Sequence, residues 1–221
     1  EMEAATVYVI DDEADVRDGL GRLLRSAKFK VEAQASGAAF LGNAPYPDIG
    51  CILLDVDMPG MTGPQLHARL GAAGIHLPVI FLTGKCSVSD GVRAMKQGAC
   101  DFLEKPVDAD TLLAAIELAV ARSRQRRSDR TRKGDIERRL AALSRRERQV
   151  LDLVIAGRLN KQIASELGIA EKTVKVHRGR VMTKMRCPSL AELVHLCDEI
   201  GLVGNAGPDG RSGAPDRMKV P

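Results

Sequence analysis

The chain has 221 residues, 44% hydrophobic and 28% charged, which is typical of a soluble protein with one large or two small domains. No apolar run approaches the ~20 residues that span a bilayer, and no basic segment precedes an apolar one at the N-terminus, so neither membrane association nor a signal peptide is expected. The 5 cysteines include no C-x-x-C pair, which argues against disulfides or zinc and indicates a reducing cytoplasm.

The net charge of +4 is unevenly distributed along the chain. Residues 1–121 contain 10 Lys/Arg and 17 Asp/Glu, a net charge of −7, whereas residues 122–221 contain 23 and 12, a net charge of +11. The acidic half suits a cation site. The basic half suits a polyanion such as nucleic acid.

The first half alternates apolar runs with amphipathic segments. Apolar runs occur at residues 7–10, 52–54, 79–82 and 102–103. Amphipathic segments lie near residues 14–27, 36–42, 64–73, 88–97 and 109–123. Five β–α units of this length predict an α/β domain over residues 4–121, with a parallel sheet covered by helices on both faces.

Polar residues follow these runs directly, namely Asp11-Asp12, Asp55, Thr83 and Lys105. Because ligands bind outside the carboxyl ends of parallel strands, we expect these side chains to converge in one crevice. Clustered carboxylates suit Mg²⁺, and a carboxylate can also be a nucleophile that forms an aspartyl phosphate. Each residue alone has a simpler interpretation, such as a helix cap for Asp11-Asp12. The full set in this order predicts a phosphoryl site.

Residues 122–140 are highly charged and contain few apolar side chains. We predict a charged, partly helical linker. Its arginines either contact DNA or belong to a solvated connector, and the connector is favoured.

Residues 141–202 have a helical pattern throughout and are predicted to form a small all-α, four-helix domain. Ser144 and Glu147 form a capping box that opens its first helix, and Asn160 is expected to cap the second. The third begins near Glu171, and a capping box at Ser189 opens the fourth. Residues 203–221 are Gly/Pro-rich and polar and are predicted to be a disordered tail.

Within this domain, a short helix, a glycine-containing turn and a longer basic helix form a helix-turn-helix pattern. On the longer helix, Val174, Val181 and Met185 share one stripe that we expect to be buried. The residues that lie off this stripe are candidates for DNA contacts: Lys172, Thr173, Lys175, Val176 and Arg180. His177 either contacts a phosphate or fills the helix interface.

The first half resembles the receiver domain of two-component response regulators. The matching motifs are Asp11-Asp12-Glu13, Leu54-Asp55-Val56-Asp57-Met58-Pro59-Gly60, Leu82-Thr83-Gly84 and Asp101-Phe102-Leu103-Glu104-Lys105-Pro106. The resemblance implies a doubly wound, flavodoxin-like sheet of five parallel strands in which Asp55 accepts phosphate. It implies that Asp11, Asp12, Asp55 and the backbone carbonyl of Asp57 hold Mg²⁺. It also implies that Thr83 and Lys105 bind the phosphoryl group and that Phe102 is the aromatic residue that changes rotamer.

The second half resembles the LuxR-type helix-turn-helix. The matching motifs are residues 143–151, Asn160-Lys161-Gln162-Ile163-Ala164 and Thr173-Val174-Lys175-Val176-His177-Arg178. The whole chain is therefore similar to FixJ/NarL-type response regulators. This resemblance implies a phosphorylation-controlled transcription regulator that is not an enzyme. It implies a sensor histidine kinase, promoter DNA and RNA polymerase as partners, and a homodimer on phosphorylation.

Two positions depart from the pattern of this family. Gly179 stands where many relatives carry a longer side chain that faces DNA, and Cys187-Pro188 replaces the usual aliphatic residue before the last helix. The glycine also costs roughly 1 kcal/mol of helix propensity relative to alanine.

Two other functions compete with this interpretation. The sequence Asp55-Val56-Asp57 after a strand also resembles the nucleophile motif of haloacid-dehalogenase phosphatases, but that fold begins with the motif, whereas here Asp11-Asp12 precedes it. The third possibility is a DNA-binding protein whose receiver is only a dimerisation scaffold. Phosphate uptake by Asp55 separates the regulator from the scaffold, and turnover of small phosphate esters would favour the phosphatase.

Overall fold

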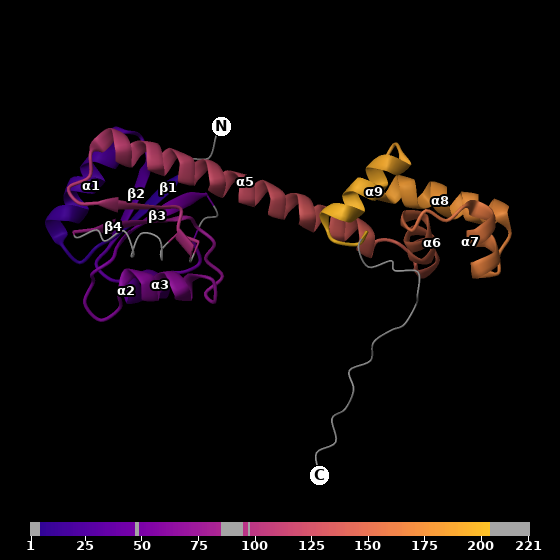
Figure 1. Ribbon diagram of the computed structural model, residues 1–221, viewed down its shortest axis with the longest axis horizontal. Helices are drawn as coiled ribbons and strands as arrows, with labels where there is room; N and C mark the ends of the chain where they lie inside the picture. The colour runs from indigo at the N-terminus through magenta and orange to yellow at the C-terminus, as the bar shows by residue number, and fades with distance from the viewer. Residues whose placement is uncertain (1–4, 47–48, 85–94, 97, 204–221) are drawn as a thin grey trace, which may run out of the picture. The chain divides into compact units, whose positions relative to one another are not determined.

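The computed structural model describes residues 5–46, 49–84, 95–96 and 98–203 (Figure 1). The chain divides into two compact units, residues 1–129 and residues 130–221, and each is described by itself.

The first unit contains one sheet of five parallel strands in the order β2-β1-β3-β4-β5. The strands are β1 (Thr6–Ile10), β2 (Lys30–Gln34), β3 (Gly50–Asp55), β4 (Val79–Thr83) and β5 (Asp101–Glu104). The strand order reverses between β1 and β3, where Ile10 pairs with Leu54. This register places Asp11 beside Asp55 at the switch point, where parallel α/β sheets bind ligands.

Helices cover both faces of the sheet, as the alternation of elements predicts. The described helices of this unit are α1 (Ala14–Ser26), α2 (Gly37–Gly42), α3 (Gly63–Leu70) and the first part of α5 (Ala109–Ala141). Figure 1 shows α1 and α5 on one face and α2 and α3 on the other. Val7 and Val9 of β1 pack in the core beneath α1 and α5, whereas Tyr8 and Ile10 pack in the other core. The helix expected over residues 88–97 lies almost entirely outside the described residues.

A buried polar contact ties α5 to the start of β3. Ser123 is 2% exposed, and its hydroxyl accepts a hydrogen bond of 3.2 Å from the backbone N–H of Gly50. This contact supplies a partner for the first amide of a strand that is buried along its whole length.

The segment predicted as a partly helical linker is helical throughout. Helix α5 continues without a break from Ala109 to Ala141. Near its end, Ile136 and Leu140 are buried among core residues of the second unit. The expectation for residues 122–140 is therefore corrected, because the last turns of this segment carry a core-facing apolar pair.

The second unit contains four further helices, α6 (Arg145–Ile155), α7 (Asn160–Leu167), α8 (Glu171–Met185) and α9 (Leu190–Glu199). Ser144 and Glu147 form the predicted capping box, and the Ser189 hydroxyl accepts from the Glu192 N–H. The expected cap by Asn160 is wrong. The side chain of Gln162 instead accepts from the N–H of Leu159, and the side chain of Asn160 accepts from Arg178. The predicted tail lies, apart from Val203, outside the described residues.

Candidate phosphoryl site and DNA interface

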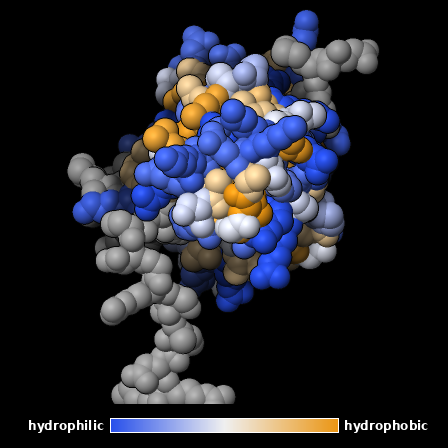
Figure 2. Space-filling view, turned by 90° about the vertical axis from the view of Figure 1, so that its right-hand side faces the viewer, coloured by the Kyte–Doolittle hydropathy of each residue, from blue (hydrophilic) through white to orange (hydrophobic). Residues whose placement is uncertain are grey.

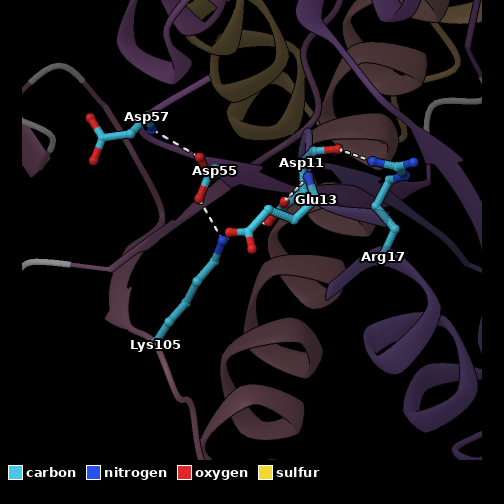
Figure 3. A network of polar contacts seen from close by, with 6 residues as sticks. All are labelled: Asp11, Glu13, Arg17, Asp55, Asp57 and Lys105. Carbon is cyan, nitrogen blue, oxygen red and sulfur yellow. Dashed lines mark hydrogen bonds and ion pairs between the residues drawn. The ribbon is translucent and has the colours of Figure 1, made fainter. Parts of the chain in front are cut away.

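Three side chains from three strand ends meet at the carboxyl edge of the sheet (Figure 3). Asp11 and Asp55 are only 1% and 6% exposed. Lys105 follows β5, and its Nζ lies 2.6 Å from Asp11 Oδ2 and 2.6 Å from Asp55 Oδ1. The backbone N–H of Lys105 also donates to the carbonyl of Thr83 at 2.7 Å. One ammonium group therefore bridges two buried carboxylates.

Backbone contacts hold these carboxylates in place (Figure 3). The N–H of Asp57 donates to Asp55 Oδ2 at 2.9 Å, and the N–H of Glu13 donates to Asp11 Oδ1 at 2.9 Å. Arg17, on the first turns of α1, donates from Nη1 to the backbone carbonyl of Asp11 at 2.7 Å. Sequence reasoning did not identify Arg17, because a contact to a backbone carbonyl leaves no spacing pattern to find.

Gly63 is a second residue that sequence reasoning missed. It is the first residue of α3, and its N–H donates to the carbonyl of Val56 at 3.0 Å. A Cβ at this position would lie 2.3 Å from the carbonyl oxygen of Asp55. Only glycine lets the helix begin this close to the strand end that carries Asp55.

The electrostatics of the crevice are dominated by burial and by the Lys105 bridge. Burial raises the pKa of Asp55, and neighbouring Asp11 adds to this, while the hydrogen bond and charge of Lys105 partly offset the rise. Burial alone would lower the pKa of Lys105, but the hydrogen bonds and charges of the two carboxylates outweigh it and raise the pKa. The ammonium therefore stays protonated at neutral pH.

The other predicted site residues lie at the same edge of the sheet. Thr83 is buried at the end of β4, and the side chains of Asp12 and Asp57 are exposed. Phe102 on β5 is half-buried, and its ring centroid lies 6.2 Å from that of Phe81. The edge thus presents carboxylates, a hydroxyl-bearing residue and an ammonium group at or just after neighbouring strand ends.

The donor set fits a hard divalent cation. Asp11, Asp12 and Asp55 offer only oxygen, and Mg²⁺ is usually held by one or two carboxylates while it keeps several waters. Within the described part of the chain, no group of three or more His, Cys, Asp or Glu side chains is placed as a complete metal cage. A cation at this edge would therefore need water or phosphoryl oxygens to complete its coordination.

The second unit presents a helix-turn-helix. Gly168 adopts a left-handed conformation (φ 64°) and turns the chain from α7 into α8. Arg178 of α8 donates from Nη1 to Asn160 Oδ1 of α7 at 2.8 Å. The predicted stripe is confirmed, since Val174, Val181 and Met185 are all buried.

The opposite side of α8 is accessible. Lys172, Thr173, Lys175 and Arg180 are exposed, and Val176 is 48% exposed. His177 is half-buried, and its Nδ1 has no hydrogen-bond partner among the described residues. Figure 2 shows the second unit from the side on which Figure 1 draws α7: hydrophilic side chains cover most of the visible surface, with hydrophobic ones in small groups. The exposed lysine, threonine and arginine side chains give α8 a polar face that is suited to enter a DNA groove.

Comparisons with known proteins agree with both units. Residues 7–117 match the family model of the response regulator receiver domain, and residues 141–197 match that of the bacterial regulatory proteins of the luxR family. The transcriptional regulatory protein FixJ of Azorhizobium caulinodans is 45% identical over 194 residues, which cover 88% of this chain and 92% of that protein. The response regulator protein TodT of Pseudomonas putida is 39% identical over 197 residues, 89% of this chain and 87% of that protein.

Solved structures agree as well. The response regulator StyR is 45% identical with a TM-score of 0.79, covering 89% of this chain and 100% of that one. Full-length FixJ from B. japonicum is 44% identical with a TM-score of 0.55, covering 90% and 98%.

A receiver unit followed by a LuxR-type helix-turn-helix defines a two-component response regulator. The chain belongs to the FixJ-type response regulators. Its function is accordingly that of a phosphorylation-controlled transcription regulator.

Proposed function

We propose that Asp55 is the phosphoacceptor and that a sensor histidine kinase supplies the phosphoryl group. The observation that carries this proposal is the buried Asp55 carboxylate, with Lys105 Nζ 2.6 Å from one oxygen and the Asp57 N–H 2.9 Å from the other. A carboxylate oxygen forms the new P–O bond while the P–N bond of the donor phosphohistidine breaks. Lys105 and Thr83 then bind the oxygens of the phosphoryl group.

Mg²⁺ fits this site as a cofactor. Asp11, Asp12, Asp55 and the backbone carbonyl of Asp57 would hold it. When bound, Mg²⁺ neutralises charge that develops on the transferring phosphoryl group. Arg17 fixes the loop that carries Asp11, since it holds the carbonyl of that residue.

Intact-mass measurement after incubation with a small phosphodonor tests the assignment. The wild type should gain one phosphate in the presence of Mg²⁺, lose it in hydroxylamine, and gain none with EDTA. Asp55→Asn should gain none, whereas Asp57→Asn, which keeps its backbone carbonyl, should still be modified. Equal uptake by Asp55→Asn would refute the assignment. Turnover of small phosphate esters, which we do not expect, would instead favour an enzyme.

For DNA, we propose that Lys175 and Val176 face the major groove of promoter DNA, while Lys172, Thr173 and His177 lie nearer the backbone, and that Arg180 also contacts DNA. The exposure of these side chains on α8 supports this arrangement. Lys175→Ala should relax discrimination at one base position by roughly 1–3 kcal/mol. Lys172→Ala should weaken binding to all sequences and reduce the salt slope by about one. Lys30→Ala, in the other unit, is the control; a uniform loss in Lys175→Ala would contradict base readout.

We propose further that phosphorylation promotes a homodimer through the surface of residues 88–97 and 101–121, of which most of the first segment lies outside the described residues. Movement of Phe102 toward Thr83 would repack this surface. Two helix-turn-helix units would then bind neighbouring half-sites and recruit RNA polymerase. The alternative is release of an inhibitory contact by the receiver. Analytical ultracentrifugation with and without phosphodonor, run beside DNA titrations of the whole chain and of segment 141–202, separates the two. A phosphorylated monomer that binds DNA tightly rules out the dimer.

We propose that the protein acts in the cytoplasm, where promoter DNA is found. The four cysteines that the structure describes are free thiols, which is compatible with a reducing compartment: Cys51, Cys100, Cys187 and Cys197. In the described part of the chain, no helix has the length and apolar character needed to cross a membrane. Fractionation of cells that express a tagged chain tests this location.

A further inference from the structure

The receiver unit has a hollow at the edge of the sheet opposite the phosphoryl site. Its volume is about 480 Å³, within the range of small-molecule sites. Pro78, which lines it, directly precedes β4, whereas Thr83 ends the same strand at the phosphoryl edge. The two sites therefore lie at opposite ends of β4, a strand roughly 16 Å long by the usual rise per residue.

The polar side chains of the hollow are all basic or imidazole groups. His67 comes from α3, His76 from the following loop and Arg126 from α5. None of the lining residues, all of which the structure describes, is acidic. Such a lining favours a ligand that carries negative charge.

Arg126 is not neutralised by its described neighbours. No hydrogen bond or ion pair joins it to another described residue, although Asp129 lies less than one helical turn further along α5. The Asp129 carboxylate instead accepts a hydrogen bond of 2.8 Å from Gln125. The guanidinium is therefore available to pair with an external carboxylate through two parallel hydrogen bonds.

The remaining walls are mainly apolar. Leu70, Ile75, Leu77 and Pro78 line the hollow, and the His67 ring packs edge-on against Phe81 with centroids 5.6 Å apart. A bare inorganic anion would leave these walls uncovered. A transition metal on the two imidazoles would face the positive charge of Arg126.

We propose that this hollow binds a small organic carboxylate, with Arg126 paired to the carboxylate and the apolar walls covering the body of the ligand. The imidazoles of His67 and His76 donate further hydrogen bonds. Burial lowers the pKa of His67, so the free site holds a neutral ring, and a bound carboxylate would raise that pKa again. His76 and Arg126 are the other titratable or charged groups that line the hollow.

The 4 histidines of the chain provide the readout, since His67 and His76 line the hollow and His177 and His195 belong to the second unit. Benzoate is titrated into the full-length chain at constant ionic strength while the ring signals of all histidines are followed by NMR. Benzamide, which has nearly the same shape without the charge, and inorganic phosphate, which lacks the apolar body, are titrated in parallel. We expect benzoate alone to shift the signals of His67 and His76 and to leave those of His177 and His195 unchanged.

Arg126→Gln should weaken this response by about tenfold or more, because a hydrogen bond to a charged group is lost. Arg124→Gln, an exposed arginine on the same helix that does not line the hollow, should leave it unchanged. Equal responses to benzoate and benzamide, equal effects of the two substitutions, or shifts in all histidines would overturn the proposal. A response to phosphate as strong as the response to benzoate would also overturn it. So would a separate Ni²⁺ titration that broadens the signals of His67 and His76 if benzoate gives no response.

Discussion

Arg139 donates a hydrogen bond of 2.9 Å from its Nη1 to the backbone carbonyl of Met185, the last residue of α8. The last carbonyls of a helix have no partner within it, and a cation near them is favourable. Arg139 also pairs with Asp135 one turn earlier on α5. The end of α5 is thus bonded to the helix that we propose to read DNA, so it belongs to the DNA-binding unit.

We predict that Ile136→Ala destabilises the second unit by about 2–5 kcal/mol, because Ile136 is buried in its core. The 2 tyrosines, Tyr8 and Tyr46, both lie in the first unit and the chain has no tryptophan, so tyrosine fluorescence reports that unit alone. Urea unfolding followed by helical circular dichroism should show the loss, while the tyrosine transition stays in place. Glu137→Ala, at the exposed neighbouring position, is the control. An unchanged dichroism transition in Ile136→Ala would show that α5 is not part of this core.

Gly63→Ala should destabilise the first unit by about 1–3 kcal/mol, as inserting atoms into well-packed sites does. The new methyl would meet the Asp55 carbonyl, so phosphate uptake should fall as well. Gly71→Ala, at the other end of α3 in right-handed helical conformation, meets no atom within 4 Å and should be nearly neutral. Tyrosine fluorescence and intact mass measure the two effects. Equal stability of both variants would contradict the close approach.

Glu147 makes the stability of the second unit dependent on pH. Its hydrogen bonds with Lys184 and with the backbone of Ser144 lower the pKa of its carboxyl to about 2. A depressed folded pKa adds stability above the unfolded value of 4.5, and this contribution is lost as pH falls toward 2. Glu147→Gln should therefore be less stable than wild type at pH 7. The difference in urea midpoint should shrink between pH 4.5 and 2; a constant difference would refute the linkage.

Gly179→Ala should stabilise α8 by roughly 0.5–1 kcal/mol, because glycine inside a helix costs backbone entropy. A Cβ at this position would meet no atom within 4 Å. Thermal unfolding by circular dichroism measures the change. A loss of stability would show that this glycine meets a constraint in the free protein.

The sequence predicted the sheet and its phosphoryl edge because the relevant signals are local. Asp11 and Asp55 follow buried apolar strands directly, and the parallel topology brings such ends together. Strand β2 has no comparable apolar run, since it lies at the edge of the sheet and is only partly buried. A strand at this position was expected only because strands and helices alternate along the first half of the chain.

Other features depend on contacts between distant parts of the chain. The segment after residue 121 was expected to be only partly helical, because Ile136 and Leu140 stand alone in a charged stretch and pack against helices that follow later in the sequence. Arg17 and Gly63 act on the backbone carbonyls of Asp11 and Asp55, which any residue type would supply. No motif of side chains could therefore indicate them.

The hydrogen bond from Gly50 to Ser123 places a natural reporter inside the receiver unit. The amide proton of Gly50 can exchange with deuterium only when its hydrogen bond to the Ser123 hydroxyl of α5 breaks or the sheet opens. Gly50 begins the same strand that Asp55 ends. The exchange rate of this one proton therefore measures, without any attached label, how firmly α5 holds the strand while the chemistry at its other end proceeds.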